Sequence, residues 1–260
     1  ITYLPYIKRI YNEQIKISSE NINQFLKKNE KYYENNEKVK YLISKYKIEN
    51  STEFGCKLKF KIKDKEYSCH YVNMCDRIET INKLFDISKF SNYFEIGGGF
   101  GTNIHLLLNN FKNIKKVIYL DIVPNLFVGT EYLRFFFGES VKDYSFFRNN
   151  NKIEFSNNDE LEIYCIPPWK IKKVSAKFDH FHNSASFQEM PEKAVKNDSE
   201  YILKFLDTKG SISLIVYDSF KKNNTLSPST INDIFKNNLY IKEFMRIDDN
   251  KKNNFYLISK

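Results

Sequence analysis

Short apolar runs along the C-terminal two thirds of the chain alternate with stretches in which apolar residues recur at helical spacing. After the first run, for example, Ile104, Leu107 and Leu108 mark one face of a helix. The apolar runs predict five strands, at residues 93–96, 117–121, 161–166, 178–182 and 211–217. The stretches between and after them predict four helices, near residues 103–111, 125–138, 191–206 and 229–237. Strands that alternate with helices predict a parallel sheet covered on both faces, and residues 241–246 and 254–259 predict an antiparallel hairpin at one edge.

The first 90 residues follow a different pattern. Residues 1–50 are rich in Lys, Glu, Asn and Tyr and predict helices with an interrupted apolar face. Alternating apolar and polar residues over 58–71 predict a β-hairpin, and Asp76 is expected to cap a following helix. We therefore expect residues 1–90 to form a helical and β-hairpin cap before a core of residues 91–260.

Four of the eight glycines of the chain fall within five residues, directly after the first core strand. A glycine-rich turn between a strand and a helix lets the backbone approach a ligand closely, because glycine has no side chain and permits positive φ. The N-terminus of the helix then offers free N–H groups to that ligand. The turn reads acid-x-G-G-G-x-G, with Glu95, Gly97, Gly98, Gly99 and Gly101.

The spacing of these glycines excludes two common phosphate-binding motifs. No third glycine completes G-x-G-x-x-G, and the lysine of G-x-x-x-x-G-K-[ST] is missing. The second core strand ends in Asp121, where a carboxylate can reach ribose hydroxyls. The turn resembles motif I of the class I S-adenosylmethionine-dependent methyltransferases. That resemblance implies a Rossmann-like sheet of seven strands, S-adenosylmethionine as the cofactor, and Asn103 and Ile122 as further cofactor contacts.

The polar segment after the fourth core strand supplies the candidate catalytic groups. Transfer of a methyl group to a hydroxyl requires a base for the hydroxyl proton, beside the cofactor. His182 is the first candidate because imidazole titrates near neutrality, and Glu189 is the alternative. His70, on the predicted cap, is the third. The expected acceptor contacts are Ser184, Asn125 and Arg77, and Asn183 is expected beside the cofactor.

The segment Ile166-Pro-Pro-Trp169 is similar to a motif of amino-methyltransferases, but two of its features are evidence against methylation of an amine. Amino-methyltransferases carry a hydrogen-bonding residue before Pro-Pro, and Ile166 cannot accept a hydrogen bond from an amine. The segment also follows the third predicted strand rather than the fourth. Trp169 is instead expected to pack on the adenine.

Four segments together resemble the sugar O-methyltransferases of bacterial surface-polysaccharide clusters. They are Glu-Ile-Gly-Gly-Gly-Phe-Gly (95–101), Tyr-Leu-Asp-Ile-Val-Pro-Asn-Leu (119–126), Tyr-Leu-Arg-Phe-Phe-Phe-Gly (132–138) and Asn-Ser-Ala-Ser-Phe-Gln-Glu-Met (183–190). The resemblance covers roughly residues 75–220. It implies O-methylation of a sugar hydroxyl, on a nucleotide-activated sugar used for capsule or lipopolysaccharide synthesis, and it fixes neither the sugar nor the carbon.

The composition of the chain limits the classes of partner, location and cofactor that we expect. The net charge of +9 favours anionic partners, but Lys and Asn are abundant throughout the chain, so the charge alone does not indicate nucleic acid. The longest apolar run is too short for a membrane span, and four cysteines without CxxC spacing indicate thiols in a reducing cytoplasm rather than a metal site. We expect no resident metal, and the sequence does not fix whether the chain forms a homo-oligomer. The alternatives are an RNA methyltransferase and a non-catalytic methyltransferase-like subunit.

Overall fold

The computed structural model describes residues 31–48, 59–217, 226–236, 239–244 and 254–259. The chain divides into two compact units, Ile1–Asn73 and Met74–Lys260. Within the described residues, no helix is long and apolar enough to cross a membrane.

The described part of the first unit contains helical residues 31–35, the helix that follows them, the predicted hairpin and the start of the next helix. Asn36 precedes the helix that begins at Glu37, and its side chain accepts hydrogen bonds from the backbone N–H groups of Lys38 and Val39 and so caps the first turn. The hairpin pairs its strands antiparallel, and Phe60 packs on Tyr33 with ring centroids 5.0 Å apart. The elements are α3 (Glu37–Lys45), β1 (Lys59–Ile62) and β2 (Lys65–Ser68). The helices expected before residue 31 lie outside the described residues.

Two details of the predicted cap are wrong. The second strand of the hairpin ends at Ser68, and α4 (Cys69–Phe85) begins at the next residue. Asp76 therefore lies inside a helix, buried, and does not cap one. The alternation that predicted a strand through Tyr71 gives way to a helical face formed by Tyr71, Val72, Cys75 and Ile78, all buried. The boundary between the two compact units falls within α4, between Asn73 and Met74.

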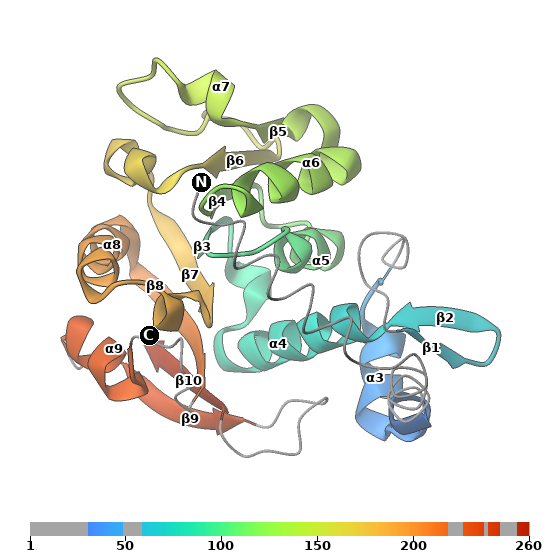
Figure 1. The fold of residues 1–260 in the computed structure, drawn as a ribbon. Coiled ribbons are helices and arrows are strands. Elements are labelled where there is room, and N and C mark those ends of the chain that lie inside the picture. Colours follow the sequence, from blue (N-terminus) through green and yellow to red (C-terminus); the bar gives the residue numbers. More distant parts are fainter. Residues whose placement is uncertain (1–30, 49–58, 218–225, 237–238, 245–253, 260) are drawn as a thin grey trace, which may run out of the picture. The chain divides into compact units, whose positions relative to one another are not determined.

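The second unit is built on one sheet, which has eight strands among the described residues (Figure 1). Its strand order is β5-β6-β4-β3-β7-β8-β10-β9, and β10 runs antiparallel to both of its neighbours, while the other pairs are parallel. The strands are β3 (Asn92–Ile96), β4 (Lys116–Leu120), β5 (Val141–Lys142), β6 (Glu162–Ile166), β7 (Phe178–Ser184), β8 (Leu206–Tyr217), β9 (Tyr240–Phe244) and β10 (Asn254–Ser259).

This order confirms the predicted class I methyltransferase fold. The first core strand, β3, lies in the middle, and the chain moves outward first through β4 and β6 and then through β7 and β8. The antiparallel pair closes one edge, as predicted. The short strand β5 at the other edge was not predicted, because two residues, Val141 and Lys142, show no recognisable periodicity.

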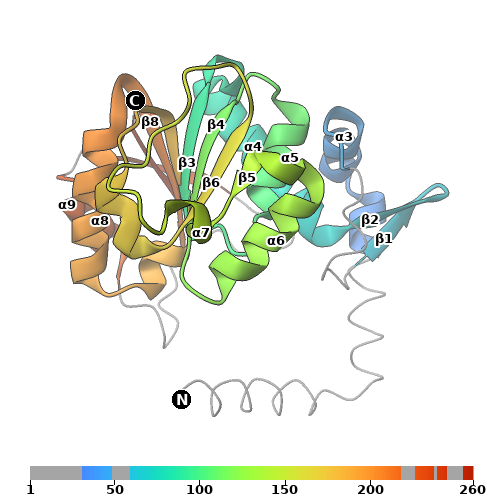
Figure 2. The ribbon, with the colours of Figure 1, turned by 90° about the horizontal axis from the view of Figure 1, so that it is seen from above.

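Helices cover both faces of the sheet (Figure 2). One face carries α5 and α6, and the opposite face carries α8 and α9. The helices are α5 (Thr102–Asn110), α6 (Asn125–Phe137), α7 (Tyr144–Phe147), α8 (Glu192–Phe205) and α9 (Pro228–Ile234). Four short 3-10 turns connect elements: η1 (Ile87–Lys89), η2 (Gly138–Ser140), η3 (Pro168–Lys173) and η4 (Ser186–Glu189).

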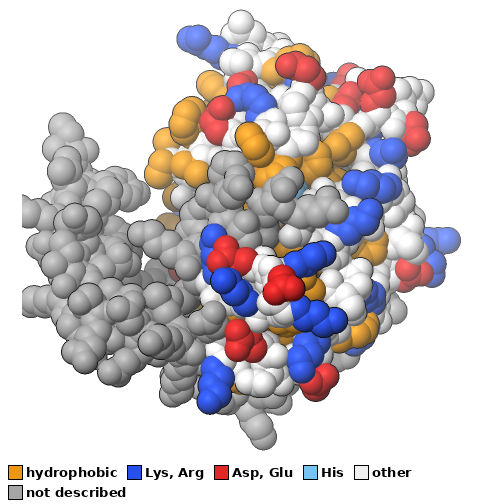
Figure 3. Space-filling model, turned by 90° about the vertical axis from the view of Figure 1, so that its right-hand side faces the viewer, with side chains coloured by type: hydrophobic (Ala, Val, Ile, Leu, Met, Phe, Trp, Pro, Cys, Tyr) orange, Lys and Arg blue, Asp and Glu red, His pale blue; other side chains and the backbone are white. Residues whose placement is uncertain are grey.

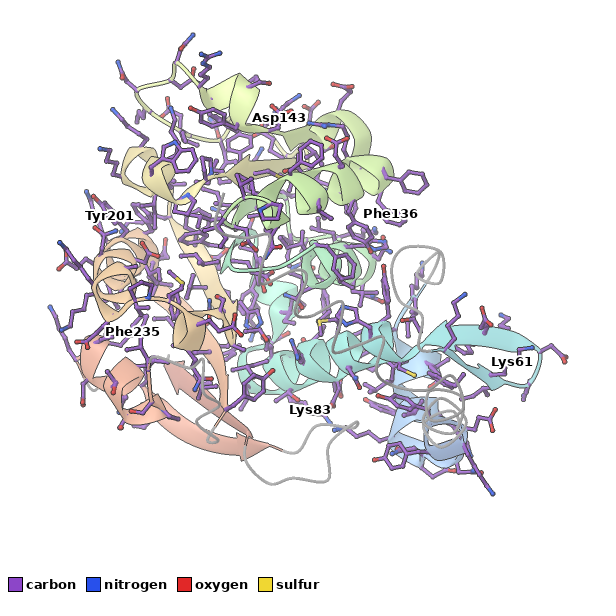
Figure 4. The ribbon with its side chains drawn as sticks, viewed as in Figure 1. Lys61, Lys83, Phe136, Asp143, Tyr201 and Phe235 are labelled. Atoms are coloured by element: carbon purple, nitrogen blue, oxygen red, sulfur yellow. The ribbon has the colours of Figure 1, made fainter. Side chains whose placement is uncertain are left out.

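The two faces differ in chemistry because strand residues alternate in direction. Toward α8 and α9, the strands present a continuous apolar core that includes Phe94, Ile118 and Phe181. Phe235, which follows α9, packs near Phe187 in this core, and both Phe235 and Tyr201 of α8 are labelled in Figure 4.

The other face buries polar side chains that bond to one another. The ring of His180 lies within 2.7 Å of both Ser211 Oγ and Ser213 Oγ and is stacked on Phe90. Between α5 and α6, His105 stacks on Phe136 with centroids 3.8 Å apart (Figure 4). Every one of these buried rings has partners, which removes the cost of burying an unsatisfied polar group.

Candidate functional site

The glycine-rich turn leaves β3 with backbone angles that only glycine adopts easily. Gly97, Gly99 and Gly101 have φ of 74°, 61° and 87°. A Cβ on Gly97 would lie 2.0 Å from Ser186 Oγ, and one on Gly101 would lie 2.9 Å from Leu133. A Cβ on Gly99 would meet no atom within 4 Å, so this residue borders open space. The turn therefore packs against other side chains at Gly97 and Gly101 and faces open space at Gly99.

Asp121 locks the turn to the neighbouring strand. Its Oδ2 accepts a hydrogen bond from the Gly99 N–H at 2.9 Å, and its Oδ1 accepts one from the Ile122 N–H at 2.7 Å. Burial raises the pKa of this carboxyl, while these two N–H groups oppose the rise. Each carboxylate oxygen has two acceptor sites, so Asp121 can still accept from a ligand.

Glu95 lies behind the turn rather than in front of it. It is 2% exposed, and Asn103 donates to its Oε2 at 2.9 Å. A Cβ on Gly98 would lie 3.1 Å from Glu95 Oε1, so a side chain there would have to push this carboxyl aside by a few tenths of an ångström. Burial raises the pKa of Glu95 to about 7, and the hydrogen bond from Asn103 opposes that rise. Glu95 and Asn103 therefore support the turn from the inside of the sheet.

A cavity of about 320 Å³ opens where the turn, the end of β4 and the end of β7 meet. This is the edge at which ligands bind open α/β sheets. Of the predicted site residues, the structure brings six to its lining: Gly97, Asp121, Ile122, Asn125, Ser184 and Glu189. A seventh, Arg77, reaches this edge from α4, where its Nη1 donates to Ser184 Oγ at 2.7 Å.

Three predicted residues lie elsewhere in the second unit. His182 is 1% exposed and faces the polar interior, with its Nδ1 2.8 Å from Ser213 Oγ. Burial lowers its pKa to about 3, with a smaller contribution from the Arg77 charge. Asn183 is also buried and bonds to Ile96 O and Ser186 Oγ, at 2.8 and 2.5 Å, so it closes the loop beneath the cavity. The structure therefore does not bring His182 or Asn183 to the cavity lining.

Trp169 is likewise not in this cavity. It is 58% exposed and lines a second, apolar depression of about 430 Å³, near Tyr144 and Phe127. The preceding residue, Pro168, lines the first cavity instead. His70 belongs to the first unit, where its ring lies edge-on to Tyr71 at 5.9 Å. Its catalytic role stays a prediction.

Seven residues of the cavity lining were not among the predicted site residues, and Asp198 is the most unusual of them. Asp198 is an acid on α8, 5% exposed, and the sequence pattern shows it only as a polar residue on an amphipathic helix. The sequence did not mark Asp198 as a site residue, because an isolated acidic residue in a helix is normally exposed to solvent. The other six are Ile96, Leu120, Pro168, Ala185, Ser186 and Met190.

Metal ligands are a separate question. Among the described residues, no three His, Cys, Asp or Glu side chains gather in an arrangement that could hold a metal ion. The residues do fit S-adenosylmethionine. Gly99 leaves space for a ligand against the backbone, Asp121 retains acceptor sites for ribose hydroxyls, and the carboxylates of Asp121 and Glu189 suit a cation.

Comparison with known proteins says little about the function of this site beyond what its geometry indicates. No known family profile matches the chain, and no curated protein matches it. Among solved structures, mitomycin 7-O-methyltransferase is similar with a TM-score of 0.47 and 10% identity over 74% of this chain and 57% of that one. Human N-acetylserotonin methyltransferase in complex with S-adenosylmethionine gives 0.47 and 10%, over 74% and 53%.

A third similar structure is magnesium protoporphyrin IX methyltransferase from Synechocystis with bound S-adenosylmethionine. It gives a TM-score of 0.48 and 12% identity, over 73% of this chain and 78% of that one. The chain thus spans little more than half the length of the first two structures. Likenesses this weak say nothing of substrate, so the function is inferred from the cavity itself.

The raised pKa of Glu95 predicts how stability depends on pH. In the unfolded chain Glu95 has its ordinary pKa of 4.5, whereas in the folded protein it keeps its proton up to a pH of about 7. The contribution of the protonated carboxyl to the free energy of unfolding is therefore fully present below pH 4.5 and is lost as the pH rises to about 7. Glu95→Gln mimics the protonated group. We expect it to match the wild type near pH 4 to 5 and to be more stable at about pH 8.

Denaturant unfolding at the two pH values measures this difference. The exposed Glu200→Gln, which removes a carboxylate that is not buried, serves as the control and should show no such divergence. Parallel stability curves for the wild type and Glu95→Gln would contradict the assignment.

Proposed function

We propose that this protein is an S-adenosylmethionine-dependent O-methyltransferase. The observation that carries the proposal is the shared cavity between the glycine turn after β3 and the Asp121 carboxylate after β4. A nucleoside lying across these two strand ends would place its ribose at Asp121 and its remaining chain along the glycines. When bound, the cofactor supplies an activated methyl group on its sulfonium.

The supporting residues divide into those that contact the cofactor and those that shape its site. Gly97, Gly99, Asp121 and Ile122 line or border the cavity and are assigned direct contacts. Trp169 lies in the second depression and is assigned no contact here. The other predicted cofactor residues act through the turn, because they hold its conformation from behind: Glu95, Gly98, Gly101, Asn103 and Asn183.

The acceptor in this proposal is a sugar hydroxyl on a nucleotide-activated sugar for surface-polysaccharide synthesis. Its support is the resemblance of residues 183–190 and 119–126 to sugar O-methyltransferases, together with the polar groups at the end of β7. Ser184 and Asn125 offer hydrogen bonds to sugar hydroxyls, and the Arg77 guanidinium beside Ser184 suits a phosphate of the nucleotide. A nucleotide-sugar substrate also implies a cytoplasmic location; oligomeric state is left open.

Glu189 is the group we assign as the general base. It lines the cavity at the end of η4, on the same loop as Ser184, and its carboxylate can accept the proton of a hydroxyl held there. His182 titrates far below neutrality and lies inside the sheet, so it would have to leave its partner Ser213 to act. We therefore rank the carboxylate first.

The charges on the face shown in Figure 3 give no support to the RNA alternative. Lys and Arg side chains alternate with Asp and Glu over the described part of the face in Figure 3. RNA-binding surfaces instead concentrate positive charge and aromatic rings along one path.

Loss of the Asp121 carboxylate should weaken cofactor binding. Asp121→Ala removes a charged acceptor, which is worth roughly 1.5–3 kcal/mol, or about tenfold or more in affinity for S-adenosylhomocysteine. Isothermal titration calorimetry measures this loss, with Asp159→Ala as the control because the Asp159 side chain is 94% exposed. Equal affinity in wild type and Asp121→Ala would remove the cofactor proposal.

The acceptor class is tested by transfer of a labelled methyl group. A panel of nucleotide sugars and total cellular RNA are incubated with the protein and labelled S-adenosylmethionine. We expect label in a nucleotide sugar, because the cavity edge offers hydroxyl-binding groups beside one cation. Label in RNA alone would contradict the sugar assignment and leave the methyltransferase assignment standing.

Replacement of the two candidate bases separates their roles. Glu189→Gln should lower kcat by about 10²- to 10⁴-fold with little change in cofactor affinity, because a positioned base contributes that much. Glu192→Gln, an exposed neighbour on α8, is the control. Full turnover in Glu189→Gln together with loss in His182→Gln, in a protein that still unfolds at the wild-type temperature, would transfer the role to the histidine.

A further inference from the structure

Asp198 is a buried acid that the proposed reaction does not use. It lies on α8 with 5% of its surface exposed, and it lines the cavity that Asp121 lines. Among the described residues, its side chain has one hydrogen bond, from the adjacent Asn197 Nδ2 at 3.1 Å. Burial raises the pKa of Asp198 to about 6, and the hydrogen bond from Asn197 opposes that rise. A buried carboxylate with so few donors is costly unless a ligand supplies one.

The position of Asp198 indicates which part of a ligand it meets. Helix α8 packs against η3, whose first residue, Pro168, lines the same cavity. Pro168 follows β6, the strand on the far side of β4 from the glycine turn. With Asp121 at the end of β4 taking the ribose, the nucleoside base therefore extends toward Pro168 and Asp198.

Part of the lining of this cavity is apolar. Leu120, Ile122, Pro168 and Met190 all line the cavity, and they offer flat contact to a heteroaromatic ring. Ligand sites commonly combine such walls with one or two polar groups that fix orientation. An ionised carboxylate only accepts hydrogen bonds, so the ring edge that faces Asp198 must carry a donor.

We propose that Asp198 recognises the exocyclic amine of the cofactor's adenine and excludes nucleosides that carry an oxygen there. The inference rests on the proposed function. It assigns specificity for the donor to an acid on α8, outside the glycine turn and outside the ends of β3 and β4. A 6-oxo purine would set its carbonyl oxygen against the carboxylate, and like partial charges repel.

Two analogues of the product test this assignment by binding alone. S-adenosylhomocysteine carries the amine, and S-inosylhomocysteine carries an oxygen in its place. Calorimetry with both compounds is compared in the wild type, Asp198→Asn and Glu200→Gln. Glu200→Gln is the matched control, since it removes an exposed carboxylate from the same helix.

We expect the wild type to bind the adenosyl compound at least about tenfold more tightly than the inosyl compound. In Asp198→Asn, affinity for the adenosyl compound should fall about tenfold, because a neutral acceptor replaces a charged one. The preference should shrink toward equality, since the new amide can donate to the inosyl oxygen. Glu200→Gln should keep the wild-type values, and thermal unfolding checks that each variant is folded.

Other results would overturn the inference. An unchanged preference in Asp198→Asn would show that the acid does not face the amine. An equal loss for both analogues would place Asp198 near the ribose or the amino-acid part of the cofactor, and a loss of turnover without a loss of affinity would place it near the acceptor. A wild type that binds neither analogue would contradict the proposed function itself, whereas binding with an unaltered preference contradicts this inference alone.

Discussion

The parallel pairing of β3 with β4, which sets Ile96 beside Leu120, fixes the geometry on which the candidate site depends. Both strands point the same way, so the glycine turn and the Asp121 carboxylate leave the sheet at one edge. The Gly97 N–H donates to Leu120 O at 2.8 Å, and the Gly99 N–H donates to Asp121, which extends the pairing beyond the strands. The turn and the carboxylate consequently behave as one positioned unit.

The two faces of the sheet support that edge in different ways. Beneath α8 and α9, aromatic and aliphatic side chains form a continuous core, and the burial of such apolar surface is the main favourable contribution to folding. On the opposite face, Glu95, His180 and His182 sit in adjacent register positions or two residues apart and are held by hydroxyl and amide partners. Such buried polar side chains stabilise the fold only while their hydrogen-bond partners are in place. The hydrogen bonds on this face therefore favour one arrangement of its side chains as well as contributing to stability.

Charge at the cavity has the opposite sign to charge on the whole chain. The protein carries a net charge of +9, yet the acids Asp121, Glu189 and Asp198 line the cavity, and no Lys or Arg does so among the described residues. A ligand with a cationic centre is therefore attracted locally by a basic protein. The net charge of a chain describes its surface, whereas the selectivity of a site follows from the few groups around it.

Local sequence determined the order of elements and the chemistry of the turn, because apolar periodicity and glycine act over a few residues. It located β3, β4 and the helices around them correctly, and the structure brings the predicted Gly97 and Asp121 to one cavity. Tertiary structure decided which residues of distant segments lie close together. It buried His182 against Ser213, moved Trp169 to a second depression and brought Asp198 to the cavity. Those outcomes depend on which face of a strand or helix meets which neighbour, and that is set only when the whole sheet and its covering helices assemble.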